Sequence, residues 1–337
     1  MKLQEIKQLA KSKSVVIDVH THVGIAPKFF YQYGYPYALS YEDMYIRMEM
    51  LGIDYSVIFP FVDSAYYVND STSSTVQTTT QYCDFPFEIE NKNLLNEIYE
   101  IFPQYSHRAL PFLMFDPSRE AEKQAAHMEQ LSEQYPVYGI KTASTYIQSF
   151  VNDLESVGRP ILDFAKKKQL PIIFHSSVHP DDPWASAYDI VNLAERHPEV
   201  RICIAHSARF AEPVLEKASQ LDNCFVDYSA FIIHCKLVQQ NSPSIAPVAN
   251  RFQADYSNAL DVMLRLANAY PDTMLWGSDT PFNYWIQKYY TASGEIAEDR
   301  LECGYKEETD VLNDLPVDIK KRIAYSNNLH FIFGEKP

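Results

Sequence analysis

The segment IDVHTH, residues 17–22, places two histidines two positions apart at the end of an apolar run. Residues two apart on a β-strand point to the same face, so His20 and His22 can both reach one metal ion beyond the strand's carboxyl end. Asp18 shares this parity and fits either an acceptor that orients a ligand histidine or a buried structural carboxylate. The pair indicates a metal site, although two half-exposed histidines bound by loop carbonyls would give the same pattern.

Three further side chains stand at the ends of apolar runs. His175 ends PIIFH, His206 ends ICIAH, and Asp279 follows LWGS. If these runs are strands of one closed barrel, their carboxyl ends meet at one mouth and the side chains converge there. Four histidines fall in predicted helices, turns or surface segments and are assigned no function: His107, His127, His197 and His330.

These side chains predict metal-assisted chemistry. Imidazole nitrogen and carboxylate oxygen favour zinc, with manganese, iron or nickel as alternatives. A divalent metal would acidify a bound water toward neutrality. Asp279 could then be both a ligand and the base that accepts the proton of the water and passes it to a leaving group. His206 could hydrogen-bond the water or a substrate oxygen, or act as a further ligand.

Eight apolar or β-branched runs are predicted to be the strands that position these residues. They lie near 15–20, 55–60, 109–114, 137–141, 171–175, 200–206, 223–228 and 273–277. Each precedes a helix-patterned segment, near 41–51, 91–106, 118–134, 153–168, 184–197, 211–221, 255–270 and 317–332. This eight-fold alternation predicts an α/β fold of the (β/α)8 TIM barrel type. A doubly wound open sheet would usually need fewer strands and a glycine-rich phosphate turn, which we do not find.

The chain is expected to form a single barrel domain over residues 1–337, with long loops after its strands. Insertions are predicted near 61–90, 229–254 and 280–315. In this fold the loops that follow the strands build the active site, so these insertions are expected at its mouth.

Composition narrows the class of protein. Apolar residues make up 46% and charged residues 22%, a balance typical of soluble globular proteins. The net charge of −15 and the lack of any Lys- and Arg-rich stretch argue against a nucleic-acid partner. The first fourteen residues are too polar for a signal peptide and no apolar run would span a membrane, so a cytoplasmic location is expected. The five dispersed cysteines are interpreted as reduced, mostly buried thiols.

Several motifs together resemble the amidohydrolase superfamily, and within it the amidohydrolase-related branch that includes the aminocarboxymuconate-semialdehyde decarboxylase type. The resemblance covers nearly the whole chain and rests on IDVHTH, MEMLGIDYSVIF, IIFHSS, IAHSAR, GSDTPF and SNNLHFIFG. It implies that His20, His22, His175 and Asp279 are metal ligands and that His206 contacts the substrate or water and sometimes joins the metal. It also implies a homo-oligomer.

Lys141 and Arg209 are the candidate substrate-binding cations. Lys141 ends YGIK, where some members of the superfamily carry a carbamylated lysine that bridges two metals, a bridge that the resembled branch generally lacks. We expect one metal, with Lys141 an unmodified cation that meets a substrate carboxylate or carbonyl, although a lysine in a structural salt bridge fits too. Arg209 could bind an anionic group bidentately or form an ion pair at a helix start. His179, in a loop, is a weaker candidate.

An aromatic cluster is expected to line an apolar pocket, or else to bury loops or a subunit interface. Its members are Phe29, Phe30, Tyr31, Tyr33, Tyr35, Tyr37, Tyr66, Tyr67, Phe282, Tyr284 and Trp285.

The first functional hypothesis is a metal-dependent hydrolase that uses activated water on an amide, ester or lactone carbonyl of a small molecule. The alternative is a metal-dependent non-oxidative decarboxylase or a hydratase of a small aromatic or unsaturated carboxylic acid. A non-catalytic barrel that binds a ligand through its aromatic loops is a third reading.

Overall fold

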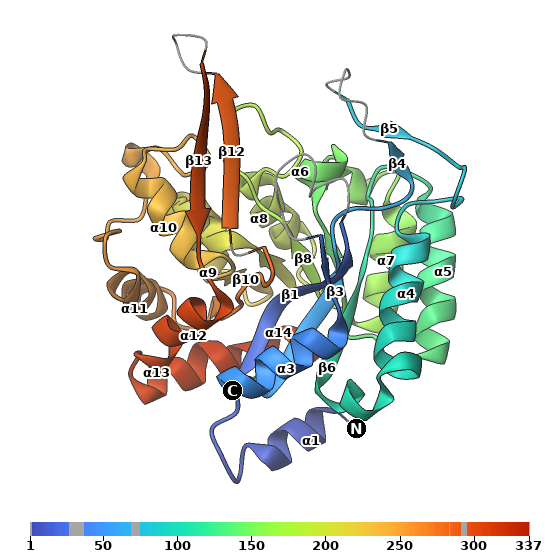
Figure 1. Cartoon of the computed structure of the whole chain (residues 1–337), viewed down its shortest axis with the longest axis horizontal. Helices are drawn as coiled ribbons and strands as arrows, with labels where there is room; N and C mark the ends of the chain where they lie inside the picture. The colour runs from blue at the N-terminus through green and yellow to red at the C-terminus, as the bar shows by residue number, and fades with distance from the viewer. Residues whose placement is uncertain (1, 27–36, 69–74, 283, 291–294, 337) are drawn as a thin grey trace.

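Eight parallel strands form the centre of the computed structural model (Figure 1). The structure describes residues 2–26, 37–68, 75–282, 284–290 and 295–336, and for 284–290 and 296–300 it describes the backbone alone. The strands follow one another around the sheet in sequence order: β1 (Ile17–Ile25), β3 (Tyr55–Pro60), β6 (Ala109–Met114), β7 (Gly139–Thr142), β8 (Ile172–Phe174), β9 (Ile202–Ile204), β10 (Cys224–Asp227) and β11 (Met274–Leu275). The predicted (β/α)8 barrel is confirmed.

The barrel closes where β1 meets the residues around and after β11. The amide of Val19 donates to the carbonyl of Trp276 at 3.2 Å, and Thr21 and Thr280 form a parallel bridge. The amide of Asp279 donates to the carbonyl of His20 at 2.8 Å. This closure brings the first and last predicted site segments, more than 250 positions apart in the chain, into backbone contact.

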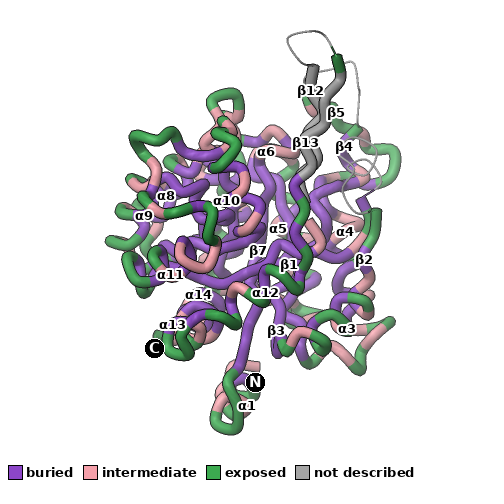
Figure 2. Tube along the Cα trace, turned by 60° about the vertical axis from the view of Figure 1, so that its left-hand side comes forward, coloured by how far each residue is buried: buried purple, intermediate pink, exposed green. Residues whose placement is uncertain are grey.

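The strands are buried on both faces, as their continuous apolar sequences predict. Every residue of β3 and β6 is buried, and both strands have the predicted bounds. Figure 2 shows the buried chain concentrated at the centre, with exposed segments on the periphery.

The helices surround the barrel, and several begin and end at the expected capping residues. Ser40 Oγ accepts from the amide of Asp43 at the start of α3 (Tyr41–Leu51), and Gly52, with φ of 72°, ends that helix. Ser186 and Asn258 cap α8 (Ala187–Arg196) and α11 (Ala259–Ala269) in the same way. The other helices of the predicted alternation are α4 (Glu88–Asn96), α5 (Ala121–Gln134), α7 (Arg159–Lys168), α9 (Glu212–Ser219), α13 (Val317–Lys321) and α14 (Asn327–Phe333).

The insertions, predicted as loops, contain regular secondary structure. The region after β3 holds β4 (Tyr67–Val68) and β5 (Gln77–Thr78), and the region after β10 holds α10 (Phe231–Gln239). The region after β11 holds an antiparallel hairpin of β12 (Tyr284–Tyr290) and β13 (Ile296–Glu302), then α12 (Tyr305–Asn313). The hairpin and the β4–β5 pair project from the same end of the barrel (Figure 1).

The short elements include α1 (Lys2–Leu9), β2 (Ala38–Leu39), which pairs with the end of β1, and α6 (Ser144–Ile147). Helix α1 lies at the end of the barrel opposite the hairpin (Figure 1). All five cysteines are buried thiols. Within the described residues, no helix has the length and apolar character needed to cross a membrane.

Candidate active site

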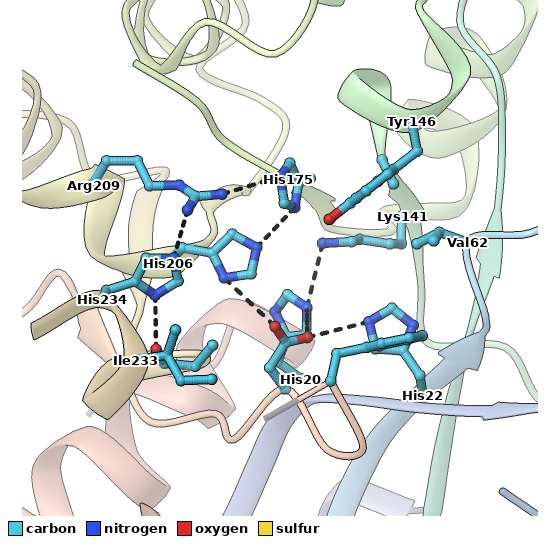
Figure 3. A pocket seen from close by; sticks show the side chains of 14 residues that line it. His20, His22, Val62, Lys141, Tyr146, His175, His206, Arg209, Ile233 and His234 are labelled. Atoms are coloured by element: carbon cyan, nitrogen blue, oxygen red, sulfur yellow. Dashed lines mark hydrogen bonds and ion pairs between the residues drawn. The ribbon is translucent and has the colours of Figure 1, made fainter. Parts of the chain in front are cut away.

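The histidine pair of β1 lies beside the pocket residues Lys141 and His206 (Figure 3) and meets the aspartate that follows β11. His20 Nε2 lies 3.2 Å from Asp279 Oδ1, and His22 Nε2 lies 3.3 Å from the same oxygen. All three side chains are buried. The three side chains therefore converge at one point, as their positions at the ends of apolar runs predict.

The nitrogens of the pair that face Asp279 are suited to bind a metal. His20 Nδ1 donates to Asp227 Oδ2 at 2.8 Å, and His22 Nδ1 donates to the carbonyl of Pro60 at 3.0 Å. Because a carboxylate and a carbonyl can only accept, the proton of each neutral ring lies on Nδ1, and the lone pair of Nε2 is directed at Asp279. An acceptor that holds the Nδ1 proton in this way is typical of histidines that bind a metal through the other ring nitrogen.

A compact group of potential ligand atoms comprises one atom each from His20, His206 and Asp279, all within 4.8 Å of one another. Burial lowers the pKa of His22 to about 4 and, together with neighbouring cations, holds the pKa of His206 well below its usual range. Neutral imidazoles beside a carboxylate fit a divalent cation. The donor set is therefore consistent with a metal centre.

His175 is not one of the three residues of this compact group, although the resemblance implies that it is a metal ligand. Its Nδ1 is 2.8 Å from His206 Nε2, and its Nε2 accepts from Arg209 at 3.1 Å. Both ring nitrogens of His175 are thus engaged, as are both of His206, whose Nδ1 lies 2.9 Å from Ser229 Oγ, so either histidine can bind a metal only by exchanging a contact. His206 occupies the place in the compact group that the predicted ligand set gave to His175.

The carboxylate of Asp279 is held in its ionised form. Burial raises its pKa, but the neighbouring imidazoles of His20 and His22 lower it by more, so the pKa lies below its ordinary value. An ionised carboxylate at this position can be a ligand or a proton acceptor.

Lys141, at the end of β7, is fully buried beside the histidine pair. Its Nζ lies 3.5 Å from His20 Nε2 and 5.2 Å from the centre of the Phe59 ring. Burial lowers its pKa to about 8, an effect that the negative charges of Asp227 and Asp279 reduce. The predicted cation is therefore inside the site.

A pocket of about 560 Å³, including the space at its mouth, opens over these groups. Arg209 also lines it, so the two predicted substrate-binding cations face the same space. The apolar and aromatic walls come from six residues of different loops and helices: Val62, Ala143, Tyr146, Ala230, Ile233 and Phe282.

Three residues of the site were not singled out from the sequence: Asp227, Tyr146 and His234. Asp227 ends a strand just as His175 and His206 end theirs, so the strand-end rule would have found it. His234 follows the seventh strand inside the apolar run FIIHCKLV, a weaker signal. Tyr146, on the short helix α6, leaves no signal that we recognise.

The predicted aromatic cluster is only partly described. Phe282 lines the pocket with its ring 4.8 Å from that of His22, Tyr66 and Tyr67 are buried, and Tyr37 is exposed. Phe29, Phe30, Tyr31, Tyr33 and Tyr35 and the side chains of Tyr284 and Trp285 lie outside the described residues. His179 is not among the pocket residues that the structure describes and accepts instead from the amide of Asp181.

The chain belongs to the amidohydrolase family, because the amidohydrolase 2 family model matches residues 17–327. This confirms the resemblance of its motifs.

Solved structures with similar folds include a dihydroorotase from Campylobacter jejuni, at 14% identity and a TM-score of 0.53, covering 96% of this chain and 84% of that one. A 5-carboxyvanillate decarboxylase from Novosphingobium aromaticivorans, solved with manganese and 4-hydroxy-3-methoxy-5-nitrobenzoic acid, has 12% identity, a TM-score of 0.56 and coverage of 96% and 97%. A β-aspartyl dipeptidase from Fervidobacterium islandicum has 12% identity, a TM-score of 0.54 and coverage of 95% and 74%. At these identities the likeness concerns the fold. None of the curated proteins matches the chain significantly by sequence.

Proposed function

We propose that the protein is a metal-dependent hydrolase that attacks an amide, ester or lactone carbonyl of a small molecule with water. The observation that carries this proposal is the meeting of His20, His206 and Asp279 within 4.8 Å, with His22 on the same carboxylate, at the floor of a pocket. Membership of the amidohydrolase family supports it.

The proposed metal ligands are His20, His22, His175 and Asp279, with His206 as the alternative to His175 that the compact group favours. When bound, a divalent metal polarises a carbonyl and lowers the pKa of water. Nitrogen and carboxylate donors favour zinc, and the manganese in the fold neighbour makes manganese the first alternative. Metal content after His175→Ala and after His206→Ala distinguishes the two candidates for the fourth ligand.

The residues of the chain would divide the remaining work. Asp279, ionised, accepts a proton from the attacking water and returns it to the leaving nitrogen or oxygen as the carbon–heteroatom bond breaks. His206 contacts the water or the substrate oxygen, and the Lys141 ammonium stabilises negative charge on that oxygen. The apolar wall around Phe282 and Ile233 limits the access of bulk water.

The test is turnover of a broad panel of amides, esters and lactones by purified protein of measured metal content. We expect product formation that a chelator abolishes and added zinc or manganese restores. Asp279→Asn should lose activity by several orders of magnitude while keeping its fold. A metal-loaded protein that hydrolyses no member of the panel but performs other chemistry would refute the proposal.

The alternative is non-oxidative decarboxylation or hydration of a small aromatic or unsaturated carboxylic acid. It is favoured by the two cations, Lys141 and Arg209, that line the same pocket. Carbon dioxide released from candidate acids and abolished by a chelator would support decarboxylation. Incorporation of labelled solvent oxygen into the product would support hydrolysis or hydration.

A non-catalytic binding barrel is the third candidate. His20→Ala distinguishes it, because a purely structural histidine could be replaced without any change in metal content. Under the proposed function the same variant loses metal.

A further inference from the structure

Arg209 enters the pocket from an unusual turn. Residues 206–210 directly follow β9, and all five have positive φ, between 48° and 63°. This conformation costs L-residues other than glycine roughly 1–2 kcal/mol each, and such strain concentrates at functional sites. The turn folds the chain back on itself and places both His206 and Arg209 on the pocket wall.

The guanidinium is fixed by three acceptors, two from the segment that follows β8 and one from helix α10. Arg209 Nε donates to the carbonyl of Ser176 at 2.7 Å, one terminal nitrogen donates to His175 Nε2 at 3.1 Å, and the other donates to His234 Nε2 (Figure 3). The side chain of Arg209 is buried. A planar fork held in this way is preorganised for a planar anion.

His234 contacts Arg209 but has no role of its own in the proposed hydrolysis. It lies on α10, and its Nδ1 is 2.7 Å from the carbonyl of Ala230. Because a carbonyl only accepts, the ring proton lies on Nδ1 and Nε2 is left as an acceptor. His234 can therefore hold the guanidinium but cannot donate to a substrate through the same nitrogen.

The charges that line the pocket favour an anion. Lys141 and Arg209 are cationic, Asp279 is anionic, and the walls between them are apolar and aromatic. A bound divalent metal would add further positive charge. A small acid with an apolar or unsaturated body matches this lining.

We propose that Arg209, positioned by His234 and by the carbonyl of Ser176, is a carboxylate-binding subsite and that the substrate is a small carboxylic acid. The proposal rests on the proposed function, since it concerns the same pocket, and it names the group that orients the substrate. It fits a hydrolase whose substrate carries a carboxylate beside the scissile bond, and it also fits the alternative reactions on carboxylic acids.

The experiment is calorimetric titration of the full-length protein with matched neutral and anionic probes, acetate against acetamide and benzoate against benzamide. Each pair is measured on metal-loaded and on chelator-treated protein, so that carboxylate binding to metal is separated from binding to Arg209. We expect the carboxylate member to bind about 10- to 100-fold more tightly in both forms, the range for a charge-assisted hydrogen bond.

Three variants test which residues cause the preference for the carboxylate probes. Arg209→Met should abolish it, and His234→Phe should reduce it several-fold, because the fork loses an anchor. His234→Gln, whose amide oxygen can accept from Arg209, should restore most of it. Arg201→Lys is the matched control, because Arg201 donates to carbonyls of Gln169 and Phe331 away from the pocket. Thermal unfolding checks that each variant is folded.

Carboxylate preference that survives Arg209→Met, or its absence from both probe pairs in the wild type, would overturn the subsite. Loss of the preference after His234→Phe without recovery in His234→Gln would overturn the positioning role of His234. None of these outcomes depends on turnover. The proposed function fails separately, if metal-loaded protein hydrolyses nothing in the panel of carbonyl substrates.

Discussion

At the scale of single residues, the function proposed here depends on how the nitrogens of His20 are oriented. Asp227 fixes them, because its Oδ2 accepts from His20 Nδ1 while its Oδ1 accepts from the amides of His206 and Ser229. One buried carboxylate thus positions the ring of one candidate ligand and the backbone of another.

Asp227→Asn should therefore weaken metal binding without removing a ligand. The amide keeps the shape of the side chain but can present an N–H to His20 Nδ1, which disturbs the tautomer that leaves Nε2 available. We expect a loss of metal affinity of about 10- to 100-fold, typical of substituting a residue that hydrogen-bonds a metal ligand, measured by competition with a chromophoric chelator. Unchanged affinity in a folded variant would mean that Asp227 is only structural.

Lys141 is expected to stay unmodified. A carbamate on its Nζ would add a negative charge beside Asp227 and Asp279, whose charges already act on this lysine. Without a second cation this repulsion is uncompensated. Intact mass measured in bicarbonate should match the unmodified chain, with one metal per chain by elemental analysis. A mass increase of one carboxylate group together with two metals would refute the single-metal arrangement.

The sequence predicted the residues of the site better than their contacts. The strand-end rule found His20, His22, His206 and Asp279 because period-2 alternation and barrel closure determine where such residues point. It could not show that His175 pairs with Arg209 and His206, because these contacts depend on the turn at 206–210. No pattern in the letters HSARF, which contain no glycine, predicts five positive φ values in succession.

At the scale of elements, the backbone strain in the turn at 206–210 should be measurable as a difference in the free energy of unfolding between two glycine variants. Ala208, with φ of 48°, and Ala165, inside α7, are both fully buried, so replacement by glycine removes one buried methyl group from each. Ala165→Gly should cost about 1 kcal/mol or more, because glycine is unfavourable within a helix. Ala208→Gly should cost less than this or stabilise the protein, because it relieves roughly 1–2 kcal/mol of left-handed strain.

Denaturant unfolding of the two glycine variants makes this comparison directly. Equal destabilisation would show that the turn at 206–210 stores no strain.

Helix α12 contacts α10, the helix that carries His234. Glu308 Oε1 accepts from the amide of Ile232 in the first turn of α10, and Glu308 is fully buried. Burial raises its pKa to about 8, above the ordinary value of 4.5. At a pH between these two pKa values, Glu308 keeps its proton in the folded protein and loses it in the unfolded chain. The free energy of unfolding should therefore fall as the pH rises from about 5 to about 8.

Glu308→Gln should flatten this part of the pH profile, because the amide retains an acceptor for Ile232 but does not titrate. Chemical unfolding at several pH values compares it with the wild type and with Glu216→Gln, an exposed control on α9. A Glu308→Gln profile as steep as that of the wild type would assign the dependence to other groups, of which buried Asp18 is the first candidate.

Elements with a clear periodicity or a cap were predicted closely, and elements without them were missed. β3, β6 and α3 have the predicted bounds. α10 lies in a region predicted as a loop, because FIIHCKL is apolar on nearly every side and has no amphipathic pattern, as expected of a buried helix. The β12–β13 hairpin was missed although YWIQKYY is rich in aromatic residues that favour strands.

At the scale of the whole molecule, the site depends on a seam between the two ends of the chain. β1 carries His20 and His22, and the segment after β11 carries Asp279, so the seam that joins them sets the distance between the candidate ligands. Asn328, on α14 and fully buried, crosses this seam. Its Nδ2 donates to the carbonyl of Ile17 at 2.7 Å and to that of Trp276 at 3.4 Å.

Asn328→Leu should therefore loosen the metal site as well as the fold. The change leaves buried carbonyls without this donor, a loss of about 1–3 kcal/mol in the free energy of unfolding. Asn223→Leu is the matched control, because Asn223 is also buried and its Nδ2 also donates to backbone carbonyls, those of Ala194, His197 and Val200, which are not part of this seam. We expect similar destabilisation from both variants, but faster metal release, measured by chelator competition, from Asn328→Leu alone. Equal release rates would mean that the site is held by its own side chains and that closure of the barrel contributes only stability.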